Sequence, residues 1–232
     1  MHRTGTLIIG LAFVATACGS SGGSKPSAPT TTTTKPSTDH AVIAAGLIRT
    51  SDLPGYSHKP PSTDSSSDID RVAKGLPECA HFVATQKDGA SKQKSPRFQL
   101  GDSHVDDSVD VYASSTIVAG QLDLYRDPTT LACIRAVFQK VLTDRIGSQG
   151  TIDKLDISPI AINELGDGSF AFRLTVAFTA NGQSTTLLFE LAGVAVGRYT
   201  IAFNPDGTTA QIAELETTLL PKLVDRMKQA GA

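Results

Sequence analysis

Three side chains that can bind a metal ion alternate within one short segment of the sequence. Asp102, His104 and Asp106 are two positions apart, so on a β-strand they project from the same face. Carboxylate and imidazole groups arranged in this way are ligands that hard or borderline cations use. The competing interpretation is a solvated strand face with ordinary loop acids. That interpretation is the more common one, so we expect no metal ion and no other cofactor.

The same segment offers a second kind of chemistry. Asp106, Asp107 and Asp110 provide the paired carboxylates that a hydrolase needs, although the sequence gives no distance between them. The stretch around Ser169 (GDGSF) lacks the second glycine of a nucleophile elbow, and the sequence contains neither a phosphate-binding loop nor a dinucleotide fingerprint. A hydrolase is therefore a distant alternative, and we expect that the protein is not an enzyme.

Residues 1–17 have the organisation of a bacterial export signal. Arg3 precedes an apolar run at 7–17 that is too short to span a bilayer permanently. The small residues directly before Cys18 resemble a lipobox, in which the cysteine receives acyl chains such as palmitate, although Ala15 stands where leucine is usual. This resemblance implies a lipid anchor on Cys18, with the protein on the extracytoplasmic face of the cell membrane. An ordinary secretory signal with an incidental cysteine is the alternative.

Composition separates a tether from a folded domain. Residues 18–39 are rich in Ser, Thr and Pro and have no aliphatic side chain larger than Ala, so we expect a disordered tether. Residues 40–232 are expected to form a single globular domain. The formal net charge is -2 at pH 7, and no basic stretch provides the footprint that nucleic-acid binding requires. We therefore expect no nucleic-acid partner.

Two cysteines remain once Cys18 is assigned to the lipid. Cys79 and Cys133 allow a single pairing, and a compartment outside the cytoplasm permits disulfides. The bridge closes a loop of about 55 residues, which the chain-entropy model values at about 4 kcal/mol. A reactive thiol partnered by His81 is the alternative, and it leaves Cys133 unexplained.

The clearest structural prediction is a hairpin over residues 170–191. Asn181-Gly182 is a strong two-residue turn signal. With these residues as the loop, the apolar side chains of both strands share one face, and Arg173 lies opposite Glu190 on the other face. The predicted pairs on the apolar face are Phe172 with Leu191, Leu174 with Phe189, and Val176 with Leu187.

Three further strands are predicted from shorter patterns. Residues 105–113 alternate between apolar and polar side chains, which is typical of a half-buried strand. Residues 152–165 read as a strand that is broken or bulged at Pro159, and this proline favours an edge position. Residues 196–203 alternate again and follow the hairpin.

Apolar residues at spacings of three and four predict the helices. The closing helix either kinks at Pro221 or begins a second helix there, and its apolar stripe is expected to pack on the apolar face of the hairpin. Residues 57–67 and 86–96 read as loops. The fold class is therefore α+β, with a mainly antiparallel sheet of four to five strands and helices largely on one face. The predicted helices lie at 40–49 with Asp39 as cap, near 68–79, at 115–125, from Asp127-Pro128 to 146, and around 212–227.

Several segments together carry a resemblance to known proteins. They are the lipobox, the turn SDLPGY at 51–56, the two cysteines, the joint VDVYASS and the strand VGRYTIAF. With them the chain resembles actinobacterial envelope lipoproteins and kinase extracellular sensor domains of α+β build. Some of these are similar to the photosystem-accessory and nuclear-transport-factor fold. The resemblance covers residues 40–230, implies a noncatalytic domain that binds a ligand or a partner protein, and carries over no functional residue.

Two binding functions follow from these observations. The leading hypothesis is an envelope domain that binds a partner protein or a cell-envelope component. The alternative is a carrier or sensor of an apolar small molecule or lipid. Leu47, Leu53 and Tyr56, with the apolar residues of 115–146, could line a lipid-sized cavity, although a hydrophobic core needs the same residues. An enclosed apolar cavity favours the carrier, whereas an open apolar patch favours protein binding.

Overall fold

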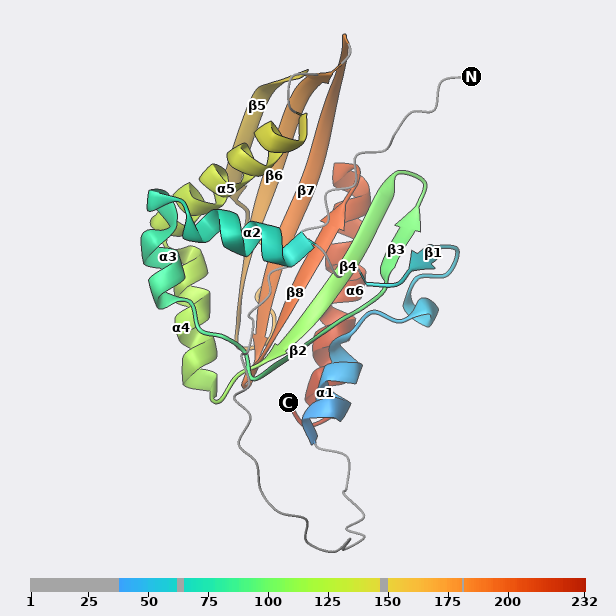
Figure 1. Ribbon diagram of the computed structural model, residues 1–232. Helices are drawn as coiled ribbons and strands as arrows, with labels where there is room; N and C mark the ends of the chain where they lie inside the picture. The colour runs from blue at the N-terminus through green and yellow to red at the C-terminus, as the bar shows by residue number, and fades with distance from the viewer. Residues whose placement is uncertain (1–37, 62–64, 147–149, 181) are drawn as a thin grey trace, which may run out of the picture.

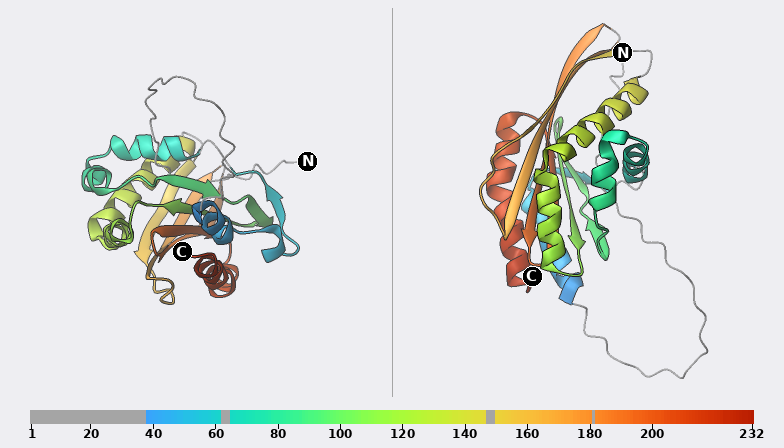
Figure 2. Two further views of the ribbon diagram at one scale, coloured as in Figure 1. Left: turned by 90° about the horizontal axis from the view of Figure 1, so that it is seen from below. Right: turned by 90° about the vertical axis from the view of Figure 1, so that its left-hand side faces the viewer.

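The computed structural model describes residues 38–61, 65–146, 150–180 and 182–232. This part of the chain forms one sheet with helices on both of its faces (Figure 1, Figure 2). Helices α1 (Thr38–Gly46) and α6 (Thr209–Gln229) cover one face, and the helices between residues 65 and 146 cover the other. The helix α1 begins two residues before the predicted domain boundary at residue 40.

The described sheet has eight strands, and every strand pair in it is antiparallel. The order is β1-β3-β4-β8-β7-β6-β5, and β2 pairs with β4 beyond the end of β3. The predicted α+β class and mainly antiparallel sheet are confirmed, but the predicted number of four to five strands is too low. The strands are β1 (Ser57–Lys59), β2 (Ser91–Lys94), β3 (Arg97–Leu100), β4 (Ser103–Val111), β5 (Gly150–Pro159), β6 (Gly168–Ala180), β7 (Gln183–Val196) and β8 (Tyr199–Asp206).

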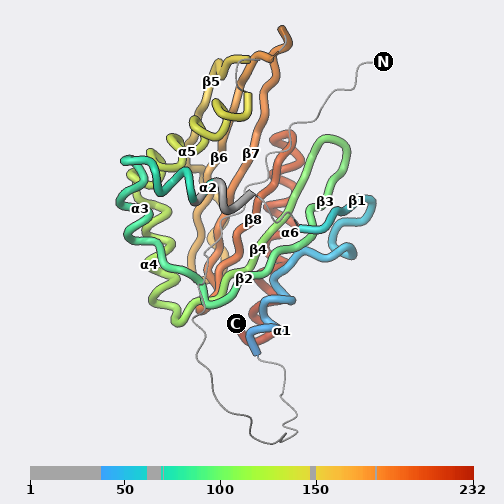
Figure 3. Tube along the Cα trace, viewed as in Figure 1, coloured from blue at the N-terminus to red at the C-terminus, as the bar shows by residue number. Residues whose placement is uncertain are grey.

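Three short strands, β1, β2 and β3, were not predicted. β1 lies in the predicted loop 57–67, and β2 lies in the predicted loop 86–96. Figure 3 shows β2 and β3 following one another along the same side of β4. Strands β2 and β3 form because β4 provides a long, fixed pairing partner, and β1 in turn pairs with β3, so the composition of these short strands carries little signal.

The β6–β7 hairpin has the predicted register. Phe172 pairs with Leu191 and Arg173 pairs with Glu190. The edge position predicted for the strand before the hairpin is also confirmed, because β5 ends the sheet. Its irregularity, however, lies between Ile152 and Lys154, and the strand ends at Pro159.

The closing helix packs on the face opposite to the predicted one. Its stripe, which includes Leu219 and Leu223, belongs to a core with Val109, Val194 and Ile201 from the central strands. The apolar face of the hairpin is occupied by α5 (Pro128–Ile146) instead, which removes it as a site for α6. The helix α6 runs through Pro221 as a single helix.

A second layer of helices lies on the far side of the sheet from α6 (Figure 2). Helices α4 (Ser115–Arg126) and α5 pack on β6 and β7. Helix α2 (Ser65–Lys74), the short 3-10 helix η2 (Pro77–Cys79) and helix α3 (Ala80–Thr85) pack in turn on α5. The prediction that the helices lie largely on one face was therefore wrong. The central strand β4 is covered on both faces, so it is almost wholly buried and not half-buried.

The first helix is fixed through Asp39, although not as a helix cap. The Tyr199 hydroxyl donates a hydrogen bond of 2.7 Å to Oδ1 of Asp39, and the Arg198 guanidinium pairs with the same carboxylate. These two donors hold the pKa of Asp39 below its usual range, the Tyr199 bond being the larger cause. The 3-10 helix η1 (Thr50–Asp52) is tied to α6 similarly, since Arg226 Nη1 lies 2.9 Å from Asp52 Oδ2.

Candidate functional site

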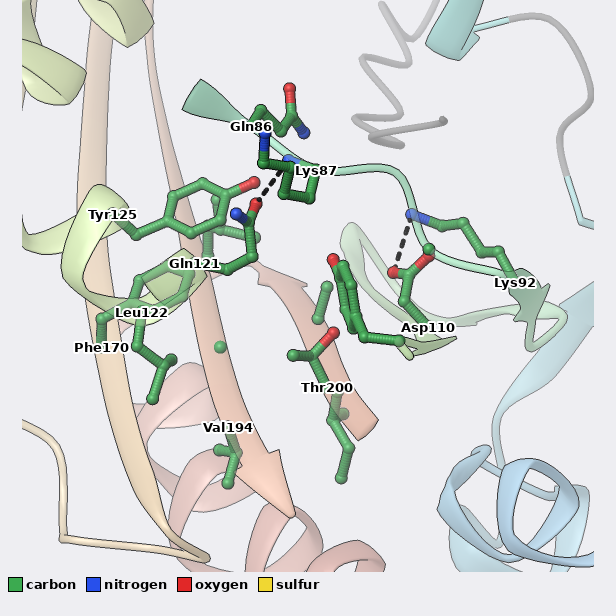
Figure 4. Close-up of a pocket in the computed structure, with 16 residues that line it drawn as sticks. Gln86, Lys87, Lys92, Asp110, Gln121, Leu122, Tyr125, Phe170, Val194 and Thr200 are labelled. Atoms are coloured by element: carbon green, nitrogen blue, oxygen red, sulfur yellow. Dashed lines mark hydrogen bonds and ion pairs between the residues drawn. The ribbon is translucent and has the colours of Figure 1, made fainter. Parts of the chain in front are cut away.

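A cleft opens between the sheet and the helix α4, and we call it the α4 cleft (Figure 4). It contains about 640 Å³ of empty space, part of which is open to solvent. Its lining residues are Gln86, Lys87, Gly89, Lys92, Asp110, Tyr112, Gln121, Leu122, Tyr125, Phe170, Leu191, Gly193, Val194, Thr200, Ile201 and Ala202.

One side of the α4 cleft is aromatic. The rings of Tyr125 and Phe170 stack with their centroids 4.5 Å apart and their planes 11° from parallel. Phe170 lies over Gly193, because a Cβ at residue 193 would come within 2.1 Å of the Phe170 ring. The absence of a side chain at Gly193 therefore lets the ring approach the sheet, and the stacked pair forms an apolar wall.

The opposite side of the α4 cleft is polar. Lys92 Nζ and Asp110 Oδ2 form an ion pair of 3.2 Å (Figure 4). Burial raises the pKa of Asp110, and the neighbouring Lys92 opposes that rise. Burial, together with the charge of Asp110, also raises the pKa of Tyr112, whose hydroxyl is hydrogen-bonded to Thr200. These groups can orient a ligand by hydrogen bonding.

The helix α4 contributes a buried amide to the same cleft. Gln121 Oε1 accepts a hydrogen bond of 3.3 Å from the backbone N–H of Lys87. Gln121 is only 4% exposed and lies on the helix face that also carries Val118 and Leu122. Neither Gln121 nor Tyr125 was predicted from the sequence to be a site residue. A polar residue within the apolar stripe of 115–125 was the signal that could have identified this part of the site.

A second cleft, the α5 cleft, lies on the same face of the sheet beside α5. It contains about 570 Å³ of empty space, again partly open. Most of its lining is aliphatic or aromatic, and polar groups gather at the edge formed by β3, β4 and β8. Its lining residues are Arg97, Asp106, Ile134, Phe138, Ile157, Phe172, Leu174, Phe189, Glu190, Leu191, Asn204, Pro205 and Asp206.

The predicted metal ligands do not form one ligand set. Asp102 is exposed, whereas His104 is buried and its Nδ1 lies 3.0 Å from Oδ1 of Asp206. Asp106 accepts a hydrogen bond of 3.1 Å from the side-chain amide of Asn204. Among the described residues, no three His, Cys, Asp or Glu side chains are grouped so that they could hold a metal ion.

The three carboxylates of the hydrolase hypothesis also separate. Asp106 and Asp110 lie on the face of β4 that looks toward the two clefts, and Asp107 lies on the opposite face beneath α1. Asp107 is fully buried, and burial raises its pKa to about 7. Its Oδ1 accepts a hydrogen bond of 3.0 Å from the backbone N–H of Ile48. Asp107 therefore has a structural environment with no access to either cleft.

The residues predicted to line a lipid-sized cavity lie on opposite faces of the sheet. Leu47, Leu53 and Tyr56 pack in the core on the α1 and α6 face of the sheet. The helices over 115–146 lie on the other face. The two groups are separated by the sheet and share no cavity.

Cys79 and Cys133 form a disulfide with a Cα–Cα distance of 4.5 Å. It joins the η2–α3 segment to α5, beside a small core that includes Phe82 and Val137. The helices on the cleft side of the sheet are therefore covalently connected. His81, the alternative partner of a reactive thiol, is exposed and lies 3.9 Å from Asp127.

The export signal, Cys18 and the tether up to residue 37 lie outside the described residues. Within the described part of the chain, no helix combines the length and the apolar character needed to cross a membrane. The structure is similar to the crystal structure of the extracellular domain of PknH from Mycobacterium tuberculosis, at 11% sequence identity and a TM-score of 0.40. The alignment covers 81% of this chain and 95% of that chain. No family model and no curated protein matches the sequence. A likeness at this score identifies no ligand or activity for the chain.

Proposed function

We propose that this protein is a noncatalytic, extracytoplasmic binding protein that takes an amphipathic component of the cell envelope in the α4 cleft. The observation that carries the proposal is the division of this cleft into two opposed sides (Figure 4). Tyr125 and Phe170 form an apolar wall, and Lys92, Asp110 and Thr200 provide polar groups across from it. Concave sites with an apolar lining and a few polar groups are typical of ligand-binding pockets.

The extracytoplasmic location rests on the export signal and is supported by the disulfide. The pattern at residues 1–17 predicts export, and Cys18 is proposed to carry the lipid that holds the protein at the membrane. A disulfide between Cys79 and Cys133 fits an oxidising compartment. A protein held at the membrane surface meets envelope molecules that have both polar and apolar parts.

The alternative function, binding of a partner protein, is less well supported by the surface of the molecule. Among the described residues, Leu100 is the one large hydrophobic side chain that is exposed, at 45%. Protein-binding surfaces usually present several apolar residues together. We therefore place the binding function in the cleft.

Native mass spectrometry of the full-length protein, purified from the envelope of its host, tests the proposal. The wild-type protein should carry an additional mass that extracts into organic solvent. The substitution Ala202→Phe places a large side chain in the lining of the α4 cleft and should remove this mass. The matched control is Thr218→Phe on the exposed face of α6, which should retain it. A wild-type protein without a bound mass, or a bound mass that persists in Ala202→Phe, would contradict the proposal.

A further inference from the structure

The α4 and α5 clefts adjoin along the strands of the sheet. Leu191 lines both of them. On β8, Thr200 and Ala202 line the α4 cleft, and Asn204 and Asp206 line the α5 cleft. These four positions alternate along one strand face, and a strand rises about 3.3 Å per residue, so the clefts together follow about 20 Å of β8.

The pairing of the neighbouring strands shows the same continuity. Phe170 pairs with Gly193 in the row of the α4 cleft, and Phe172 pairs with Leu191 in the next row on the same face. Two positions along a strand correspond to about 7 Å, the distance at which large side chains of adjacent rows meet. A ligand that follows the strands passes from one cleft to the other across Leu191.

The far part of this path is suited to a hydrocarbon chain. The α5 cleft is walled by Ile134 and Phe138 from α5, and by Phe172 and Leu174 from β6. These side chains belong to one hydrophobic cluster, so the wall continues into the core without a polar break. An apolar chain here gains by leaving water, whereas a polar group finds partners only along one edge.

Two of the three cations on the polar edge of the path form ion pairs. Lys92 is paired with Asp110 at 3.2 Å, and Arg97 is paired with Asp206 at 3.0 Å. Lys94 is the third cation of this edge; burial lowers its pKa, and the carboxylates of Asp106 and Asp110 oppose that fall. On β2, β3, β4 and β8 this edge therefore holds three cations and three carboxylates, so along these strands neither an anionic nor a cationic headgroup meets a net opposite charge. An uncharged headgroup that forms hydrogen bonds is the complementary one.

We infer that the two clefts form one site for a single-chain lipid with an uncharged, hydrogen-bonding headgroup. The headgroup lies in the α4 cleft beside Gln121 and Thr200, and the chain crosses Leu191 into the α5 cleft. This inference rests on the proposed function, because it names the class of ligand that the α4 cleft takes.

Binding of monoacylglycerols of increasing chain length to the full-length protein tests the inference. Titration followed by native mass spectrometry, from octanoyl to hexadecanoyl glycerol, should show affinity rising with each added methylene, up to about fourfold per buried group. No binding of any member would overturn the inferred ligand class, whereas the proposed function itself is decided by the mass that co-purifies with the wild-type protein. Binding of octanoyl glycerol without a gain for longer chains would overturn the lipid inference and leave the α4 cleft as a site.

Two further comparisons make the test specific. The substitution Leu191→Trp narrows the junction, so the ratio between the octanoyl and hexadecanoyl dissociation constants should fall toward one. In Thr218→Trp, on the exposed face of α6, the ratio should stay at the wild-type value. If Leu191→Trp does not fold, Ile134→Trp, which fills the α5 cleft from the helix side, should give the same loss. If Leu191→Trp folds and keeps the wild-type ratio of the two dissociation constants, the inference that the chain passes Leu191 is wrong.

The headgroup is tested with wild-type protein and ligands of one chain length. Hexadecanoyl glycerol should bind at least tenfold more tightly than hexadecanoic acid or hexadecyltrimethylammonium. An anion or a cation that binds as tightly would overturn the inference of an uncharged headgroup.

Discussion

The backbone N–H of Ile48 donates a hydrogen bond of 3.0 Å to Oδ1 of Asp107, and this contact connects the chain after α1 to the buried centre of β4. The carboxylate is fully buried, and its Oδ2 has no hydrogen-bond partner among the described residues. Because burial disfavours the charged form, the folded protein holds a proton on Asp107 more tightly than the unfolded chain does.

This environment predicts a pH-dependent stability. The pKa of Asp107 rises from 3.8 to about 7 on folding, so its contribution to stability is fully present below pH 3.8 and is lost as the pH rises toward about 7. The loss is on the order of 4 kcal/mol. In Asp107→Asn the side chain stays uncharged, so the free energy of unfolding relative to wild type should increase between pH 4.5 and 7.5. Urea unfolding of both proteins at pH 4.5 and pH 7.5 measures the two free energies of unfolding. The same difference between variant and wild type at both pH values would contradict the prediction.

A second carboxyl group should act in the same direction at higher pH. Burial and the neighbouring Glu190 raise the pKa of Glu216 from 4.5 to about 8. Its contribution to stability is therefore lost as the pH rises from about 4.5 through 8. Glu216→Gln keeps a donor toward Glu190 at every pH, so its melting temperature relative to wild type should rise between pH 5 and 9. Glu214→Gln on the exposed part of the same helix is the control and should show no such rise.

The contact between Phe170 and Gly193 predicts the effect of adding one methyl group. In Gly193→Ala the Cβ would lie 2.1 Å from the Phe170 ring, so the ring must move and its stacking on Tyr125 is lost. We expect destabilisation of about 1–3 kcal/mol. Gly120→Ala in α4 is the matched control, because no atom lies within 4 Å of its added Cβ, and it should be neutral or stabilising by up to about 1 kcal/mol. Equal effects of the two substitutions on urea unfolding would contradict the packing argument.

Removing the disulfide should destabilise the domain. The double variant Cys79→Ser and Cys133→Ser frees a loop with a sequence separation of 54 residues. The chain-entropy model then gives a loss of about 4 kcal/mol, reduced by any strain in the native bond. Urea unfolding of the wild type should show the same loss when a reductant is added, and the double variant should not respond to reductant. A midpoint of the wild type that is insensitive to reductant would contradict a structural role of the bond.

The sequence by itself determined the local features of this fold. The Asn181-Gly182 turn and the alternating residues around it determined the register of β6 and β7, because a slip of one position would invert every side chain. The proline at the start of α5 and the apolar spacing behind it determined that helix in the same way. The count of cysteines left Cys79 and Cys133 as the single pair.

Only the tertiary structure decided which helices and strands pack against one another, and this packing determines where the two clefts lie. Local periodicity shows that a strand has an apolar face, but it does not show which helix covers that face, so the prediction placed α6 on the face that α5 covers. The short strand β1 depends on β3 as a partner and β2 depends on β4, so their own residues carried no signal. The clefts arise where Gly193, Ala202 and the side chains of α4 and α5 meet, residues that are far apart in the sequence. Such a site depends on the packing of layers, which no single segment of the sequence encodes.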